Sequence, residues 1–214
     1  MPALPATGSV LSDLGQLFQG LPHRFSTAEA LEKAEGPPFH LLNIGDVAEL
    51  TVRAPEGEPV ALPRDAPPQY ALREGDVLIT IRTRPVRAAV VPGDPPPMMP
   101  TQNLAVLRPD PGRLHGPYLA AYLNTAEAQA ELERQYEQSA ATPLLSLGKL
   151  RELPIPVPPL DTQRRVAELA LGFEDEERAA LAALGERRAL VQGAIRHAIH
   201  FQTDPSPTEP TRTL

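Results

Sequence analysis

The last quarter of the chain imposes the strongest constraint on the fold, because a mainly apolar series of residues recurs at spacings of three and four from Val166 to Ala198. This periodicity predicts one α-helix of about 40 residues, roughly 60 Å long at 1.5 Å per residue. The apolar stripe is narrow, about two positions in seven, which is the width of a coiled-coil seam. Glycines within it cost about 1 kcal/mol each relative to alanine, so we expect a partner helix to stabilise it. The residues expected in that interface are Val166, Leu169, Phe173, Leu181, Leu184, Val191 and Ile195.

The first half of the chain predicts short strands separated by turns. Residues 39–50 and 77–81 are apolar and rich in β-forming residues, and each segment predicts a buried strand. Residues 82–85 predict a hairpin tip that leads into a strand at 86–91, and residues 103–109 predict a further strand. Strands at this spacing indicate a mixed or antiparallel sheet, which we expect to be barrel-like.

Helices are predicted after these strands. Residues 118–137 carry apolar side chains at helical spacing, and Thr125 is placed to begin a second helix within that stretch. Ser146 predicts the start of a short helix that must end before Pro154, and residues 154–159 then predict extended chain at a sheet edge. The fold class is therefore α/β, of the α+β kind: a small barrel-like sheet with helices, followed by one long helix.

The expected organisation has three parts. Residues 1–158 form a folded domain, residues 159–202 form the long helix, and residues 203–214, which are polar and broken by prolines, form a disordered tail. The total of 214 residues suits one domain of ordinary size plus an accessory element.

Composition excludes several classes of protein. The chain has no cysteine, which excludes a disulfide scaffold, a cysteine nucleophile and a thiolate zinc site. It has no run of about 18 apolar residues, and residues 1–10 lack the pattern of a secretion signal. We therefore expect a soluble, cytoplasmic protein without a membrane partner. Because the net charge is −7, the chain has no attractive overall field for nucleic acid, and any DNA binding must come from a local patch or a partner.

Known catalytic motifs are missing from the sequence. It has neither the phosphate-binding loop that ends in Gly-Lys-Ser/Thr nor the Gly-x-Ser-x-Gly turn of serine hydrolases. Asp110 follows a proline as in some nuclease motifs, but no Glu-x-Lys follows it, and His197 and His200 lack a third nearby metal ligand. We therefore predict a non-enzyme with no metal or cofactor. A small metal-dependent nuclease that uses Asp110 or the histidine pair is the less favoured alternative.

Three motifs follow one another along the chain. Residues 75–79 (GDVLI) form a turn and strand, residues 145–150 (LSLGKL) begin the short helix, and residues 153–164 (LPIPVPPLDTQR) lead into the long helix. In this order they resemble one target-recognition repeat of the specificity subunit of type I restriction–modification systems, over about residues 10–200. The third motif is the most specific. It places five residues where the family has them: Pro156, Pro158, Pro159, Leu160 and Gln163.

The resemblance implies that the chain reads DNA and directs an enzyme. Complete subunits of that family carry two such repeats, and their long helices pack antiparallel between two DNA-reading domains. This chain has one repeat, and half-length forms in the family homodimerise on a palindromic split site. The implied partners are double-stranded DNA, a DNA methyltransferase subunit and a restriction or translocase subunit. The alternative is an assembly or decoy protein that keeps the fold and binds a methyltransferase or defence partner without reading DNA.

Three arginines form the densest basic group in the predicted DNA-reading domain at 1–158. They are Arg82, Arg84 and Arg87. We expect Arg82 and Arg84 on one face of a strand that ends in a turn, where they suit a phosphate or a guanine edge. A solvated hairpin is the alternative interpretation.

Other polar candidates for DNA contact lie in two short segments. The resemblance places a DNA-approaching loop at residues 20–25, with Gln19, His23 and Arg24 as its polar tips. Gln102 and Asn103 suit the hydrogen-bonding edge of adenine, although either residue could instead cap a strand end.

Overall fold

The computed structural model describes residues 8–48, 50–53, 55, 57–136 and 144–201, apart from the side chains of residues 200 and 201. The chain divides into two compact units, Met1–Leu171 and Gly172–Leu214. The division falls within the long helix α5 (Leu160–Phe201), so the sheets, the other helices and the first turns of α5 belong to the first unit. The predicted tail at 203–214 lies outside the described residues.

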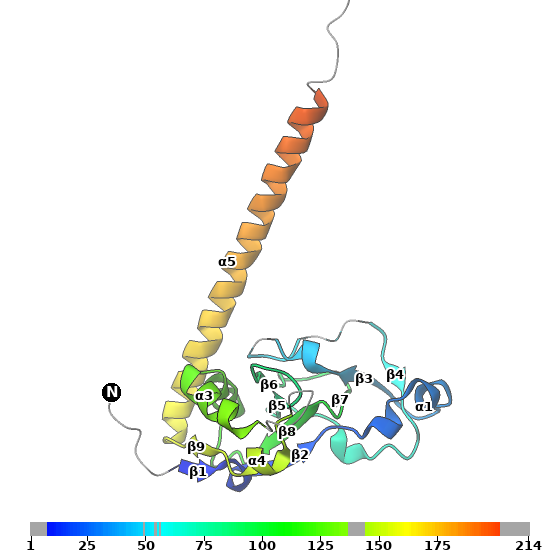
Figure 1. Cartoon of the computed structure of the whole chain (residues 1–214), viewed down its shortest axis with the longest axis vertical. Coiled ribbons are helices and arrows are strands. Elements are labelled where there is room, and N and C mark those ends of the chain that lie inside the picture. Colours follow the sequence, from blue (N-terminus) through cyan, green and yellow to red (C-terminus); the bar gives the residue numbers. More distant parts are fainter. Residues whose placement is uncertain (1–7, 49, 54, 56, 137–143, 202–214) are drawn as a thin grey trace, which may run out of the picture. The chain divides into compact units, whose positions relative to one another are not determined.

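A four-stranded antiparallel sheet forms the centre of the first unit (Figure 1). Its strands, in spatial order, are β2 (Gly15–Gln19), β8 (Leu104–Pro109), β5 (Val77–Thr80) and β6 (Ala88–Val90). Three register pairs define the alignment: Gln19 with Ala105, Thr80 with Leu104, and Ile79 with Ala88. The strands predicted at 77–81 and 103–109 and the hairpin between β5 and β6 are confirmed.

Two smaller sheets complete the strand pattern. The three-stranded sheet contains β4 (Val60–Ala61), β3 (Pro38–Leu42) and β7 (Met98–Pro100), and β3 pairs with β7 in parallel. The two-stranded sheet pairs β1 (Gly8–Val10) with β9 (Pro154–Pro156), so the proline segment does form an edge strand. Within the part of the chain that the structure describes, β2 and β6 are the edges of the central sheet, and no closed barrel forms. The expected barrel-like closure is therefore not present.

The strand predicted at 39–50 is too long, because the backbone turns immediately after β3. Asn43 accepts a hydrogen bond on its side-chain oxygen from the Ile44 amide at 3.0 Å, and Asp46 accepts one from the Asn43 amide at 2.7 Å. The same two side chains form a capping box for the 3₁₀-helix Ile44–Asp46, in which the Asn43 side chain accepts from the Asp46 backbone and the Asp46 side chain accepts from the Asn43 backbone. Side chains that can bond the local backbone therefore end the strand, although the apolar pattern continues.

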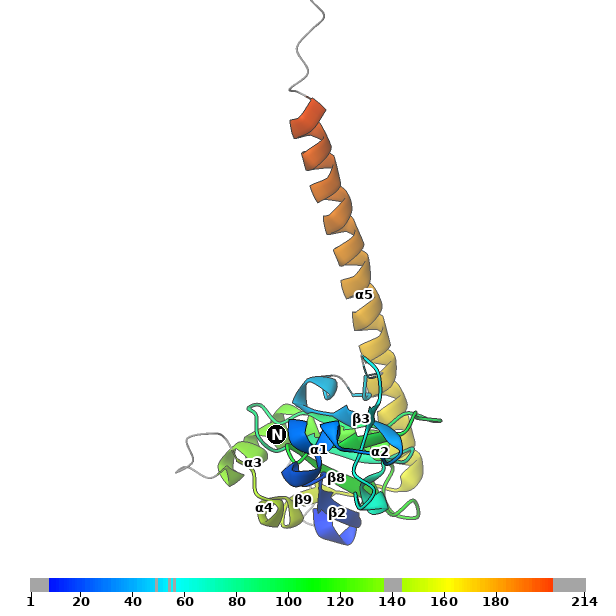
Figure 2. The same cartoon turned by 90° about the vertical axis from the view of Figure 1, so that its right-hand side faces the viewer.

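Both faces of the central sheet are buried, which accounts for the unbroken apolar run of β5. Val77 and Ile79 contribute to one hydrophobic cluster and Leu78 to another, as expected when side chains alternate along a strand. The first cluster includes residues of α2 (Gly116–Leu123) and α3 (Ala126–Gln135), and the second includes Leu42 and Met98 from the smaller sheet. In Figure 1, helix α3 lies on one side of strands β5 and β8, and strands β3 and β7 lie on the other side. Figure 2 shows the same layers with α1 (Ala28–Glu32) and β3 toward the viewer.

The predicted helix starts are confirmed by side-chain caps. Thr125 accepts a hydrogen bond from the Ala128 amide at 3.3 Å, which divides the predicted 118–137 helix into α2 and α3. Ser146 begins α4 (Leu147–Arg151) in the same manner, since its hydroxyl accepts from the Lys149 amide. Asn124, at the end of α2, uses its side-chain amide to pair with both backbone groups of Ala88 in β6. The helices are thus tied to the sheet by hydrogen bonds as well as by apolar contact.

The long C-terminal helix is confirmed, and α5 spans 42 residues. Most side chains of its apolar stripe are exposed, including Leu169 at 75% and Phe173 at 69%. All seven side chains of the predicted interface are exposed in the chain: Val166, Leu169, Phe173, Leu181, Leu184, Val191 and Ile195. No described helix is long and apolar enough to cross a membrane.

A buried ion pair joins β8 to the turn that begins β5. Gly75 adopts a φ of +80°, which favours glycine, and this turn directs Asp76 into the protein, where its side chain is 1% exposed. The Arg108 guanidinium donates to both Asp76 carboxylate oxygens, at 2.9 and 2.7 Å, and the Arg73 amide donates at 2.9 Å. Arg108 also donates to the Ala71 carbonyl at 3.0 Å. The Gly-Asp motif therefore has a structural role.

We predict that Asp76→Ala lowers the free energy of unfolding by about 3–5 kcal/mol, because it leaves the Arg108 guanidinium largely buried without its counter-charge. Urea denaturation followed by circular dichroism measures this. Asp65→Ala removes a carboxylate that lies on an exposed loop and should change the same free energy by no more than about 0.5 kcal/mol. Equal effects of the two substitutions would contradict the assigned role of the ion pair.

Candidate nucleic-acid interface

Residues that are distant in sequence meet at one end of the central sheet. Because the sheet is antiparallel, the last residues of β2 and β5 lie beside the first residues of β8 and β6. Five of the predicted DNA-contacting residues adjoin these strand ends. We call this region the polar end of the sheet and define it by Gln19, Asn43, Arg82, Arg87, Gln102 and Asn103.

Hydrogen bonds connect the amide side chains at the polar end. The Gln19 side chain donates to the Gln102 carbonyl at 2.7 Å, and the Asn103 side chain donates to the Asn43 side-chain oxygen at 3.0 Å. The Thr101 hydroxyl also donates to that oxygen, at 3.3 Å. The sequence did not single out Asn43, because it lay inside the strand predicted at 39–50; the signal was the Asn-x-x-Asp spacing of a capping box.

The predicted loop at 20–25 lies against the same end of the sheet. The Gly20 amide donates to the Leu104 carbonyl at 2.9 Å, and the Leu21 amide donates to the Pro100 carbonyl at 2.7 Å. A Cβ atom at Gly20 would lie 2.3 Å from the Thr101 carbonyl oxygen, so only glycine allows this approach. His23 and Arg24 follow as exposed residues of the 3₁₀-helix His23–Phe25, whose Phe25 is buried.

The three arginines of the predicted hairpin differ in their surroundings. β5 ends at Thr80, whose hydroxyl oxygen accepts a hydrogen bond from the Arg87 amide and whose amide donates to the Arg87 carbonyl. Residues 81–85 are a series of bends, so the expectation that Arg82 and Arg84 share a strand face is wrong. Arg87 is exposed. Arg82 is partly buried, and its Nε has no hydrogen-bond partner among the described residues.

Arg84 is held against helix α3. Its guanidinium lies 2.8 Å from a Glu133 carboxylate oxygen and 4.2 Å from the centre of the Tyr136 ring. The Tyr136 hydroxyl donates to the Thr83 carbonyl, and burial raises the pKa of Tyr136 to about 12. Arg84 must give up the Glu133 ion pair to contact a phosphate through both of its terminal nitrogens, so it is a weaker candidate for DNA contact than Arg82 or Arg87.

A shallow groove of about 330 Å³ borders the polar end. It is lined by side chains from β2, the 101–103 turn and α4, together with Tyr70. Gln19, Gln102 and Arg151 supply its polar groups, and Phe18 and Tyr70 supply aromatic rings whose centres are 6.1 Å apart. Amide, guanidinium and aromatic groups in one groove are suited to contact with bases and backbone of a nucleic acid.

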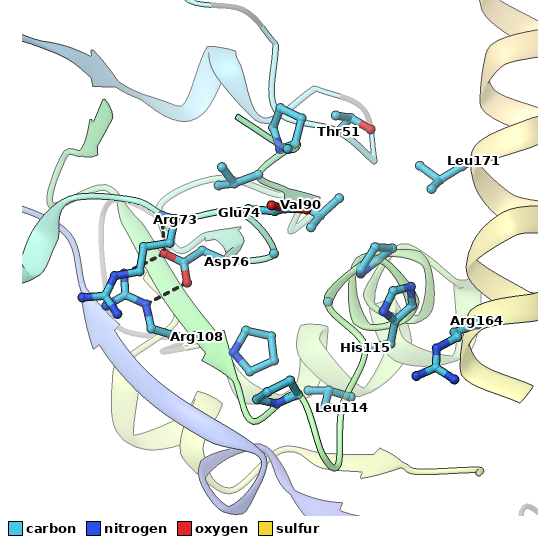
Figure 3. A pocket seen from close by; sticks show the side chains of 18 of the residues that line it. Thr51, Arg73, Glu74, Asp76, Val90, Arg108, Leu114, His115, Arg164 and Leu171 are labelled. Carbon is cyan, nitrogen blue, oxygen red and sulfur yellow. Dashed lines mark hydrogen bonds and ion pairs between the residues drawn. The ribbon is translucent and has the colours of Figure 1, made fainter. Parts of the chain in front are cut away.

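The opposite end of the sheet contains a larger cavity, about 660 Å³, within the first unit (Figure 3). The Asp76–Arg108 ion pair forms part of its wall, and His115 and Arg164 lie close to one another on another part of the wall. Burial lowers the pKa of His115, and the positive charge of Arg164 lowers it further. The two ends of the sheet are therefore chemically distinct.

Gln163, the glutamine of the third motif, connects the start of α5 by hydrogen bonds to the segment that immediately precedes α2. Its side chain is fully buried. Its Oε1 accepts from the His115 amide at 2.8 Å, and its Nε2 donates to the carbonyls of Arg113 and Pro158 at 3.0 and 2.8 Å. All three polar contacts of the amide are satisfied by backbone groups, so this motif residue also stabilises the fold.

The residues considered for metal binding do not form a cluster in the described part of the chain. Nowhere among these residues do three or more histidine, aspartate or glutamate side chains gather in a group suited to hold a metal ion. Asp110 is exposed and accepts a hydrogen bond from the Gly112 amide at 3.0 Å. The side chain of His200 lies outside the description.

Three solved structures are examples of chains that share this fold. An HsdS subunit from Thermoanaerobacter tengcongensis matches with 24% identity and a TM-score of 0.53, over 87% of this chain and 41% of that one. The S subunit of a type I restriction–modification system from M. genitalium matches with 16% identity and a TM-score of 0.54, over 95% and 49%. A chain from a study of assembly and conformational transition in a type I R-M system matches with 23% identity and a TM-score of 0.56, over 92% and 45%. The chain spans slightly less than half of each.

The sequence identifies the family. The model of the type I restriction modification DNA specificity domain matches residues 32–172, well over half of the chain. The chain therefore belongs to the type I restriction–modification DNA specificity domain family. No curated protein matched the chain in a sequence comparison.

We predict that Gln163→Ala lowers the free energy of unfolding by about 1–3 kcal/mol, because it leaves buried backbone groups such as the His115 amide without a partner. Thermal and urea denaturation of the purified chain measure this. Gln192→Ala, an exposed glutamine on the same helix, is the matched control and should have almost no effect. If both substitutions behave alike, Gln163 does not have the role that the hydrogen bonds indicate.

Proposed function

We propose that the chain is the sequence-reading subunit of a type I restriction–modification complex. In this role it performs no catalysis and directs a partner DNA methyltransferase, with or without a restriction or translocase subunit, to its target. Double-stranded DNA is bound at the polar end of the sheet. Family membership supports the general role, and the gathering of amide and guanidinium groups from four strand ends at one place supports the location.

The polar end offers the groups that base reading and phosphate contact require. Asparagine and glutamine amides present a donor and an acceptor side by side, which suits base edges in the major groove. Arg82 and Arg87 supply positive charge next to the amides, and His23 and Arg24 extend from the neighbouring loop. Base edges are thus contacted by the amides, and phosphates are contacted by the surrounding cations.

One observation favours a second candidate function. The net charge is −7, and phosphate neutralisation by cations supplies most non-specific DNA affinity. An assembly or decoy protein that binds a methyltransferase or defence partner without reading DNA needs no such charge. DNA binding in the presence of the methyltransferase distinguishes the two functions.

We predict salt-dependent binding of duplex DNA by the chain together with its methyltransferase. Arg82→Ala and Arg87→Ala should each weaken binding, by roughly 1–3 kcal/mol where the arginine contacts a base through two hydrogen bonds. Where the arginine contacts a phosphate instead, its replacement should reduce the slope of log affinity against log salt concentration by about 1. Fluorescence anisotropy at several salt concentrations measures both effects.

The control for the DNA experiment is Arg64→Ala, which removes an exposed arginine that is not one of the residues of the polar end and that lies 3.5 Å from a Glu35 carboxylate oxygen. It should leave the affinity and the salt dependence unchanged. If the wild-type complex does not bind duplex DNA more tightly than the methyltransferase alone, the decoy function is favoured.

We also propose that the chain homodimerises through α5 and so places two DNA-reading domains on a split, palindromic site. The exposed apolar stripe supports this part of the proposal, since a narrow seam on one long helix is typical of a coiled coil. Charge supports an antiparallel direction. Glu177 and Arg188 lie three turns apart on the stripe, so an antiparallel pair centred between Ala182 and Ala183 sets Glu177 against Arg188 of the partner subunit. Leu181 then faces Leu184 of the partner subunit.

We predict that Glu177→Arg weakens the dimer roughly tenfold or more. The twofold symmetry of the pair places residue 177 against Arg188 of the partner subunit twice, so the substitution replaces two ion pairs by two contacts between like charges. The charge-exchanged variant, Glu177→Arg with Arg188→Glu, should recover most of the affinity. Sedimentation equilibrium of the full chain gives both dissociation constants. A wild-type particle of 23.1 kDa at micromolar concentration would rule out the homodimer.

A further inference from the structure

The orientation of the Asn43 side chain is fixed by its neighbours. The backbone amide of Ile44 donates to the side-chain oxygen at 3.0 Å, and a backbone N–H can only donate, so the atom that accepts must be the oxygen. The Asn103 amide and the Thr101 hydroxyl approach the same oxygen, at 3.0 and 3.3 Å. Asn43 itself is exposed. Its NH₂ group therefore remains as a donor that no other described residue uses.

The neighbouring Asn103 has the complementary free group. Its NH₂ donates to Asn43, and its backbone carbonyl accepts from the Ile81 amide at 3.2 Å. Its side-chain oxygen has no hydrogen-bond partner among the described residues and remains as an acceptor. Because the two amides are hydrogen-bonded to one another, the free donor and the free acceptor belong to two side chains in direct contact at the polar end.

A fixed donor beside a fixed acceptor matches one base in the major groove. Adenine presents the N7 acceptor and the N6 amino donor, whereas guanine presents two acceptors. Cytosine presents its amino donor, and thymine presents one acceptor and a methyl group. In most complexes a single asparagine or glutamine provides both groups for adenine, but here each asparagine would contribute one.

We propose that Asn43 and Asn103 act as one composite reader of an adenine at a single position of the target sequence. The Asn43 amide donates to N7, and the Asn103 oxygen accepts from N6. The bonds from Ile44 and Thr101 prevent the Asn43 amide from rotating, so the pair is organised before DNA binds. This inference rests on the proposed DNA-reading function and adds to it the residue pair and the base that it selects.

The test is selection of bound duplexes from a random DNA library by the chain with its methyltransferase. Asn43→Asp keeps an oxygen for the Ile44 amide and replaces the outward donor by an acceptor. The preference for adenine should fall by roughly 5- to 100-fold at one position, as expected for the loss of a good bidentate contact, and should be unchanged at the other positions. Asn43→Ser also keeps a capping oxygen but has no NH₂ group, so it should give the same loss without an added charge.

The matched control is Gln16→Glu, which introduces the same charge change at an exposed position of β2. It should leave the preference at every position unchanged. Thermal denaturation of each variant shows that the fold is retained. Loss of adenine preference at one position in both Asn43 variants supports the composite reader.

Unchanged preferences in both Asn43 variants, or a uniform loss of affinity at all positions, would overturn the composite reader while leaving the DNA-reading function in place. If the wild-type chain with its methyltransferase selects no sequence from the library, the proposed function itself fails, and the inference fails with it. The two failures are thus distinguished by the wild-type selection alone.

Discussion

The antiparallel pairing of β5 with β8, and of these strands with β6 and β2, is the interaction on which the rest of the structure depends. Both faces of this sheet are buried, so a slip of one residue would exchange the side chains of Val77 and Leu78 between two different hydrophobic clusters. Burial therefore fixes the register, and the register fixes which residues emerge at each end. The polar end exists because Gln19 pairs beside Ala105 and Thr80 beside Leu104.

The motif residues that carry the family resemblance mainly stabilise the fold. Asp76 neutralises Arg108 inside the protein, and Gln163 satisfies backbone groups of the segment before α2 and of the segment before α5. Each of these two side chains pairs a buried polar group that would otherwise destabilise the folded state. This separation suits the proposed DNA-reading role, since the residues that hold the framework are distinct from the residues of the polar end.

Much of the fold follows from local signals in the sequence. The hairpin of β5 and β6, the break between α2 and α3 at Thr125, the α4 start at Ser146 and the long helix were all predicted, because caps and apolar periodicity act within a few residues. The strand predicted at 39–50 was too long, because a capping box at Asn43 outweighs the apolar pattern. The prediction that Arg82 and Arg84 share a strand face was also wrong, because β5 ends at Thr80 and residues 81–85 bend.

The sequence by itself determined the long C-terminal helix, its narrow apolar stripe, the hairpin of β5 and β6, and the starts of α3 and α4, because each of these depends on residues close together in the chain. Only the tertiary structure decided that Arg84 is engaged by Glu133 and Tyr136, and that Asn43 lies beside Asn103. Asn43 and Asn103 are separated by 60 positions, and no local pattern encodes their contact. Strand register brings such residues together, and register follows from burying both faces of the sheet at once.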